Sequence, residues 1–202
     1  SGNTIESFFL MHNTMYQGFL TINDQHHVYA SHWWEWITLL RPMWFSFEPS
    51  TLNGHDVEQG IWAGGNPVLF WVSLPFLVLM SWRAVFTADR RARVIALLYW
   101  STLIFWITAP RPLQMFYYYL PSSMWLGAVI VWAYDRYFSN PRDSKHFLSH
   151  EFYKFAKLSR HWILIGFTLM CALTFFYFLP VLDARPLSPG RYLDWMWLQS
   201  WI

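Results

Sequence analysis

The chain has few charged residues and almost no cysteine. Only 13% of its 202 residues are charged, whereas 55% are hydrophobic and 22% aromatic, a balance that excludes an ordinary soluble globular domain. The single cysteine, Cys171, lies in an apolar run and has no partner for a disulfide within the chain. The formal net charge of +2 is too small to indicate a nucleic-acid partner. The composition therefore predicts an integral membrane protein.

The sequence also shows no signal-peptide pattern and no recognisable metal-binding signature. It begins SGNTIESFF, with neither a basic stretch ahead of an apolar one nor an initiator methionine, which favours the C-terminal part of a longer protein. Four residues of types that bind zinc lie close together, but they match neither HExxH nor CxxC. They are His26, His27, His32 and Glu35. Histidines at a membrane surface commonly bind only backbone or headgroups, so we expect no metal and no other cofactor.

Four apolar segments approach the length of about 20 helical residues that crosses a bilayer core. They are residues 66–86, 93–109, 113–134 and 162–182. Asn66 and Pro67 form a helix-start signal before the first segment, as N-cap and first helical residue. Pro75 and Pro121 fall within the first and third segments and predict kinks there.

We therefore predict an all-α membrane protein with three parts. These are interfacial helices and a loop on the outer face (1–65), four transmembrane helices (66–182) and an outer-face tail (183–202). Within the first part, the apolar spacing of residues 5–21 favours an interfacial helix, and residues 33–40 favour a shorter one. Residues 48–65 are rich in Pro, Ser, Asn and Gly, which indicates a polar loop.

The basic residues predict the orientation in the membrane. The loops after the first and third expected spans hold ten of the fourteen Lys and Arg residues. The opposite side has only four basic residues, but eight of the twelve acidic residues and five of the eight histidines. Because cytoplasmic loops are enriched in Lys and Arg, we expect both termini on the outer face of the membrane.

Residues 26–42, HHVYASHWWEWITLLRP, combine three Trp, three His, one Glu and one Arg. Such a segment is too aromatic for a solvated loop and too polar to span a bilayer. Trp has an apolar body and a polar edge, so it collects at the level of the headgroups. The segment is therefore expected at the outer membrane surface.

The candidate binding residues lie on this outer side. Arg41 ends the Trp-rich segment and Arg111 stands in a Pro-Arg-Pro turn; either guanidinium can pair bidentately with a lipid phosphate, although snorkelling to headgroups explains both equally. Tyr117 and Tyr118 can bind a headgroup or a sugar, with an aromatic belt as the plainer alternative. His32 and Glu35 share one helix face and complete the set. No outer carboxylate stands out as a catalytic base.

Five segments, taken in order, carry a family resemblance. They are IESFFLMHNTMY, HHVYASHWWEWITLLRP, GNPVLFW, RPLQMFYYYLP and YLDWMWLQSWI. Together they resemble the C-terminal four-span region of the protein O-mannosyltransferase family. The members of this family are glycosyltransferases of the GT-C type. The resemblance covers nearly the whole chain, and the Arg41-Pro42 pair looks more like bacterial members than eukaryotic ones.

The resemblance implies transfer of mannose, or a related sugar, from a polyprenyl or dolichyl phosphate carrier to Ser or Thr hydroxyls of a protein. The reaction would take place on the outer face of a membrane, here a bacterial inner membrane. In the family an Asp of an Asp-Glu motif acts as base, and this chain contains no Asp-Glu dipeptide. The N-terminal half of the same enzyme would supply it, so this chain would be inactive alone. The implied partners are membrane lipid, the sugar donor, an acceptor protein and that N-terminal half.

One alternative stays open at the level of sequence. The chain can also be a non-catalytic membrane subunit or scaffold that binds the lipid carrier without turnover. A transporter is disfavoured, because no expected span carries a central charged residue.

Overall fold

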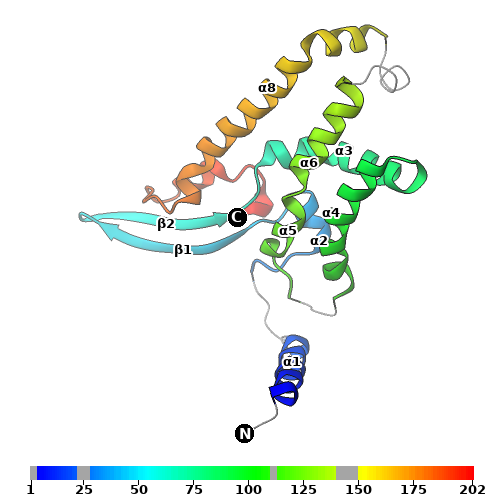
Figure 1. The fold of residues 1–202 in the computed structure, drawn as a ribbon. Coiled ribbons are helices and arrows are strands. Elements are labelled where there is room, and N and C mark those ends of the chain that lie inside the picture. The colour runs from blue at the N-terminus through cyan, green and yellow to red at the C-terminus, as the bar shows by residue number, and fades with distance from the viewer. Residues whose placement is uncertain (1–3, 22–27, 110–112, 140–149) are drawn as a thin grey trace.

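The computed structural model describes residues 4–21, 28–109, 113–139 and 150–202, and it is mainly helical (Figure 1). The α-helices are α1 (Thr4–Thr21), α2 (Trp33–Ile37), α3 (Pro67–Phe86), α4 (Arg90–Thr108), α5 (Leu120–Ser123), α6 (Leu126–Ala133) and α8 (His150–Leu182). Short 3₁₀ turns are η1 (Phe116–Tyr119), η3 (Arg191–Trp195) and η4 (Gln199–Trp201), and η2 (Tyr134–Ser139) is π-helical. Two strands, β1 (Met43–Leu52) and β2 (His55–Ala63), form a hairpin.

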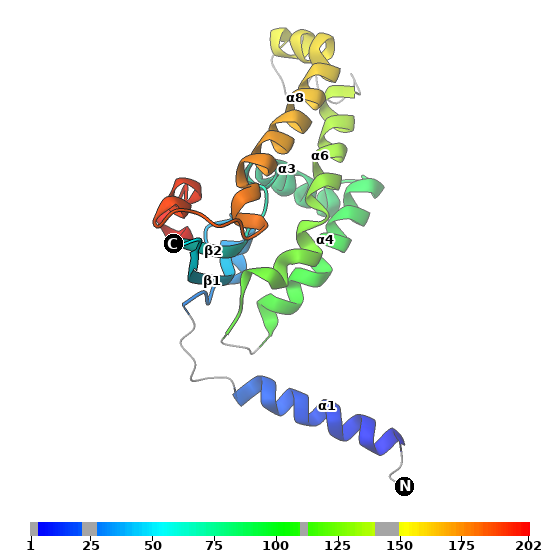
Figure 2. The same cartoon turned by 90° about the vertical axis from the view of Figure 1, so that its left-hand side faces the viewer.

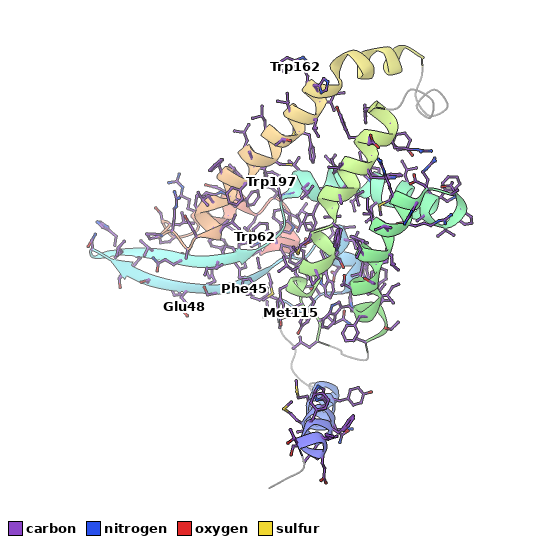
Figure 3. The ribbon with its side chains drawn as sticks, in the orientation of Figure 1. Phe45, Glu48, Trp62, Met115, Trp162 and Trp197 are labelled. Carbon is purple, nitrogen blue, oxygen red and sulfur yellow. The ribbon has the colours of Figure 1, made fainter. Side chains whose placement is uncertain are left out.

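Two helices, α3 and the part of α8 from His161 to Leu182, are long and apolar enough to cross a membrane. The expected start of α3 is confirmed, because the Asn66 side chain accepts hydrogen bonds from the backbone N–H groups of the first turn. The same side chain donates to the Cys171 carbonyl at 2.8 Å and so ties α3 to α8. Apolar side chains along α8 stay exposed, including Trp162, 73% exposed, near its upper end in Figure 3. Such a surface is typical of a helix that faces lipid.

The segment expected as the third span, residues 113–134, differs from a single helix. It runs through η1, α5 and α6, with Pro121 in the first turn of α5. Proline offers no backbone N–H, so the chain needs other contacts there. The hydroxyl groups of Tyr99 and Tyr119 lie 2.6 Å apart, and the Ser122 hydroxyl donates to the Tyr99 carbonyl at 3.0 Å. These buried contacts attach the broken segment to α4.

The prediction of an all-α protein is wrong, because residues expected as a polar loop form the β1–β2 hairpin. Asn53 and Gly54 adopt φ of 54° and 80°, as the two central residues of a type I′ turn require, and glycine reaches this region without strain. Leu52 pairs with His55 across the turn, and the register continues to Met43 and Ala63. The Asn-Gly dipeptide was the local signal for this hairpin. The high content of turn-forming residues around it favoured a loop instead.

The C-terminal tail after α8 folds back beside the base of the hairpin, as both Figure 1 and Figure 2 show. Glu58 of β2 and Leu187 exchange two backbone hydrogen bonds of 2.8 and 2.9 Å. The Glu58 carboxylate also accepts from the Gly190 backbone N–H at 2.7 Å. The hairpin is thereby held against the tail rather than projecting freely.

Helix α1 confirms the helix expected over residues 5–21 and lies apart from the other elements in both views (Figures 1 and 2). Its apolar side chains are exposed, with Ile5 and Phe9 each at 66%. Exposed apolar side chains on such a helix are typical of a surface that meets lipid or another polypeptide segment.

Candidate functional site

Helix α2 and the turn after it form the centre of the candidate site. The backbone N–H of His32, the N-cap residue, donates to the Glu35 carboxylate at 2.6 Å. This is one half of a capping box, in which a carboxylate in the first turn reaches back to the start of the helix. The negative charge of Glu35 also suits the positive end of the helix. Glu35 is therefore anchored through one carboxylate oxygen.

Three successive carbonyl groups of the turn at residues 38–40 each accept a hydrogen bond from a distant side chain. The pairs are Trp71 Nε1 to Thr38 (3.0 Å), Trp201 Nε1 to Leu39 (2.8 Å) and the Ser200 hydroxyl to Leu40. Leu39 is fully buried and has a φ of 55°, a left-handed conformation that strains a leucine backbone. We refer to residues 38–41 as the locked turn, because the surrounding structure imposes this conformation.

Arg41 is the last residue of the locked turn and has an exposed side chain. Its Nη2 donates to the Val28 carbonyl at 2.9 Å. Among the residues that the structure describes, this is the hydrogen bond that orients the guanidinium. A guanidinium has five N–H donors, so most of them stay available to a ligand. The geometry thus presents a fixed cation with unused donors on an open surface.

Aromatic rings form one wall beside α2. Tyr118 stacks on Trp106 with ring centroids 4.0 Å apart and an interplanar angle of 13°. Trp36 meets both rings edge-on, at 6.3 Å from Tyr118 and 6.4 Å from Trp106. The Tyr117 hydroxyl donates to the Tyr118 hydroxyl at 3.0 Å, and the Tyr117 ring lies 6.0 Å from that of Phe45. Phe45 and Tyr117, 59% and 38% exposed, are the exposed rings at the edge of this wall.

Hydrogen bonds fix α2 relative to α4 and to the segment before η1. The Trp36 indole donates to the Ser31 hydroxyl at 2.8 Å, and the Ser31 backbone N–H donates to the Gln114 carbonyl at 2.9 Å. The Gln114 side chain in turn donates to the Trp106 carbonyl at 3.0 Å. The candidate site therefore joins α2 to the end of α4 and the segment that follows it, which are far from α2 in the sequence.

The C-terminal tail reaches the same region. Tyr29, in the loop before α2, lies close to Tyr192 of η3; burial raises the pKa of the Tyr29 phenol, and the neighbouring phenol raises it further. The Trp62 ring stacks on Phe178 at 5.1 Å and also lies 5.1 Å from Trp201. Figure 3 shows Trp62 and Trp197 between the hairpin and the end of α8.

The structure brings five of the six sequence-predicted residues to α2, the locked turn and η1. They are His32, Glu35, Arg41, Tyr117 and Tyr118. The sixth, Arg111, lies outside the described residues, as do His26 and His27. Among the described residues, no three His, Cys, Asp or Glu side chains are close enough together to hold a metal ion.

Sequence reasoning missed the residues that hold the locked turn. Trp71 lies in α3, and Ser200 and Trp201 lie at the end of the tail. The terminal segment YLDWMWLQSWI carried a signal, since its tryptophans are abundant, but nothing local says which carbonyl an indole will reach. Long-range packing decides that pairing.

These features are typical of a membrane region, in which apolar helices carry an aromatic, hydrogen-bonded site. A family model described as the C-terminal four TMM region of protein-O-mannosyltransferase matches residues 4–201. The chain belongs to the protein O-mannosyltransferase family, of which it is the C-terminal membrane region. Among the described helices, only α3 and α8 are long and apolar enough to cross a membrane. Helix α4 begins with arginines, and the expected third span, residues 113–134, is divided into shorter helices.

Two relatives are bacterial enzymes. The polyprenol-phosphate-mannose–protein mannosyltransferase of Mycobacterium tuberculosis is 21% identical over 182 residues, which cover 87% of this chain and 33% of the relative. The protein of the same name from Mycolicibacterium smegmatis is 21% identical over 186 residues, which cover 89% and 34%. The chain thus spans about a third of the length of these curated relatives.

A solved structure has the same fold. It is the Saccharomyces cerevisiae protein O-mannosyltransferase Pmt1-Pmt2 complex bound to the sugar donor, with 16% sequence identity and a TM-score of 0.65. The match covers 100% of this chain and 27% of that chain. At this identity the likeness concerns the fold alone.

Proposed function

We propose that this chain is the C-terminal membrane region of an enzyme that transfers mannose, or a related sugar, from a polyprenyl phosphate carrier to Ser or Thr hydroxyls of a protein. The observation that carries the proposal is the family match over nearly the whole chain. The two bacterial relatives are named as polyprenol-phosphate-mannose–protein mannosyltransferases, which supports this donor and this acceptor class.

The locked turn supports a role in binding the carrier phosphate. Arg41 is exposed and oriented by one bond to Val28, while the carbonyls before it are held by Trp71, Trp201 and Ser200. A cation that is fixed before the ligand arrives needs little reorganisation when negative charge develops on a leaving phosphate. Arg41 therefore acts as an electrostatic clamp, and the Tyr117 oxygen, whose proton is donated to Tyr118, offers an acceptor to a hydroxyl of the headgroup or sugar.

The other predicted residues play supporting roles. Glu35 and His32 set the start of α2 and so the direction in which the locked turn leaves the helix. Tyr118 stacks on Trp106 and accepts a hydrogen bond from the Tyr117 hydroxyl, so it holds Tyr117 in place. Arg111 stays in the proposal as a second cation of the outer side. The catalytic base comes from a part of the protein outside this chain, and no metal or other cofactor takes part.

The test is substitution of Arg41 in the full-length enzyme. We expect Arg41→Ala to lower kcat/KM for transfer from lipid-phosphate mannose by about 10²-fold or more. In other enzymes, the removal of one preorganised hydrogen-bond donor lowers the rate by about this factor. Arg41→Lys keeps the charge but not the bidentate geometry, and we expect partial recovery. Transfer of radiolabelled mannose to a Ser/Thr peptide measures both.

Arg185 provides a matched control for this experiment. It is an exposed arginine of the same outer side, and its Nε pairs with the Asp183 carboxylate at 2.9 Å. Arg185→Ala should leave the transfer rate within twofold of the wild type. Equal rates for Arg41→Ala and the wild type, with the variant folded, would remove Arg41 from the carrier site.

A further inference from the structure

Two adjoining hollows lie between α4 and α6, at the end of α4 opposite to the locked turn. Their volumes are about 1070 and 400 Å³. Both are lined by Arg90, Arg91, Trp132 and Asp135, so they form one continuous site. Arg90 and Trp106 are 16 residues apart in one helix, which at 1.5 Å per residue places this site about 24 Å from the aromatic wall of the candidate carrier site.

The larger hollow is apolar and open along its length. Val94 and Ile95 of α4 face Ala128 and Val131 of α6 across it, and Leu164 of α8 closes one side. Val94 and Val131 are 50% and 62% exposed. An open apolar slot of this size, slightly above the range of about 300–1,000 Å³ typical of ligand pockets, has room for an acyl chain.

The smaller hollow is polar and has an excess of positive charge. Three arginines line it, against two carboxylates, Asp89 and Asp135. Both carboxylates are already engaged. Asp89 lies 3.6 Å from the Arg83 guanidinium and accepts from the Trp132 indole at 3.3 Å, and Asp135 pairs with Arg91 at 2.6 Å.

Of the three arginines, Arg91 pairs with Asp135 and the charge of Arg136 acts on Asp89, so Arg90 is the cation that remains. Within the part of the chain that the structure describes, its exposed side chain has no hydrogen bond or ion pair, although it lines both hollows. A guanidinium is a strong partner for phosphate oxygens. Arg90 lies where the polar hollow meets the apolar slot. A phospholipid has its phosphate at the matching boundary, between its polar headgroup and its acyl chains.

We propose that this double hollow binds an anionic glycerophospholipid, with its phosphate at Arg90 and an acyl chain between α4 and α6. Charge complementarity and the apolar slot together select this occupant. A polypeptide segment would fill the slot but would leave Arg90 without an anion. The lipid would brace α4 against α6 at the basic end of the region, away from the site proposed for the sugar carrier.

The experiment uses the full-length protein in nanodiscs that contain equal amounts of phosphatidylglycerol and phosphatidylcholine. Native mass spectrometry after release from the nanodisc counts the lipids that stay bound. We expect phosphatidylglycerol to be retained in preference. Arg90→Gln should reduce its retention about fivefold, the effect of one cation near an anionic headgroup. Val131→Trp, at an exposed position, should fill the slot and reduce retention without changing any charge.

Arg93→Gln is the matched control, because Arg93 is an exposed arginine of the same helix that lines neither hollow. Retention in this variant should equal that of the wild type. Thermal unfolding confirms that each variant is folded. Equal retention of both lipids, or undiminished retention in Arg90→Gln and Val131→Trp, would overturn the proposal. So would a photo-crosslinker at Val94 that captures another segment of the polypeptide instead of lipid.

Discussion

Asp89 is the carboxylate most firmly held at the basic end of the region. Burial by itself would raise its pKa. The backbone N–H of Ala92 and the Trp132 indole lower it, and the charges of Arg136 and Arg83 lower it further, so the pKa of Asp89 lies below its ordinary value of 3.8. A carboxyl group with a depressed pKa stabilises the fold above its unfolded pKa, and that contribution is lost as the pH falls through the folded pKa.

We predict that Asp89→Ala lowers the free energy of unfolding by about 1–2 kcal/mol, because it removes the N-cap of α4 together with the contact to Arg83. The loss should be complete at pH 7 and should shrink below about pH 4, where protonation weakens the wild type as well. Thermal unfolding in detergent at several pH values measures it. Asp135→Ala is the control, since its pair with Arg91 is exposed and should cost less than about 1 kcal/mol. Equal losses in the two variants would contradict the prediction.

At the scale of elements, the tail and the locked turn depend on each other. The Trp201 indole is buried and donates to the Leu39 carbonyl, which lies 162 residues earlier in the chain. A buried carbonyl that loses its donor costs about 1–3 kcal/mol. The strained backbone of Leu39 persists only while such contacts over-determine it.

We therefore predict that Trp201→Phe lowers the free energy of unfolding by about 1–3 kcal/mol and speeds hydrogen exchange at the backbone amides of the locked turn. Trp197→Phe makes the same change in the same aromatic cluster, but Trp197 is 44% exposed and should cost less. Hydrogen exchange followed by mass spectrometry, together with thermal unfolding, compares the two. If both variants exchange alike at residues 38–41, the Trp201 hydrogen bond does not hold the turn.

At the scale of the whole molecule, the parts of the protein at the two ends of α4 differ in chemistry. One end holds α2, η1, the hairpin and the tail, whereas the other holds the arginine-rich helix ends where α3 leads into α4. Cytoplasmic loops are enriched in Lys and Arg, so we predict that the basic end faces the cytoplasm and the candidate carrier site faces outward.

This orientation predicts which introduced cysteines react from outside the cell. Ser50→Cys, exposed on β1, should react with a membrane-impermeant maleimide in intact cells. Ala88→Cys, exposed in the turn before α4, should react only after the membrane is permeabilised. The unsubstituted protein gives the background, which includes Cys171 of α8. The reverse labelling pattern would invert the topology.

Local properties of the sequence determined much of this protein. Apolar length and the Asn66-Pro67 start predicted α3, and hydropathy predicted the membrane part of α8. The abundance of Trp predicts that residues 26–42 lie at the membrane surface, which stays a prediction. Each of these follows from residues that are neighbours in the chain. The Asn53-Gly54 turn was also local, and the hairpin could have been predicted from it.

Only the tertiary structure decided how the candidate site is held. Arg41 was visible as a cation next to a proline, but its orientation depends on the Val28 carbonyl and on the tail that locks the preceding turn. The division of residues 113–134 into shorter helices likewise depends on buried hydroxyl contacts with α4. Hydropathy and turn propensity act over a few residues, whereas a hydrogen bond between Trp201 and Leu39 exists only once the helices between them have packed.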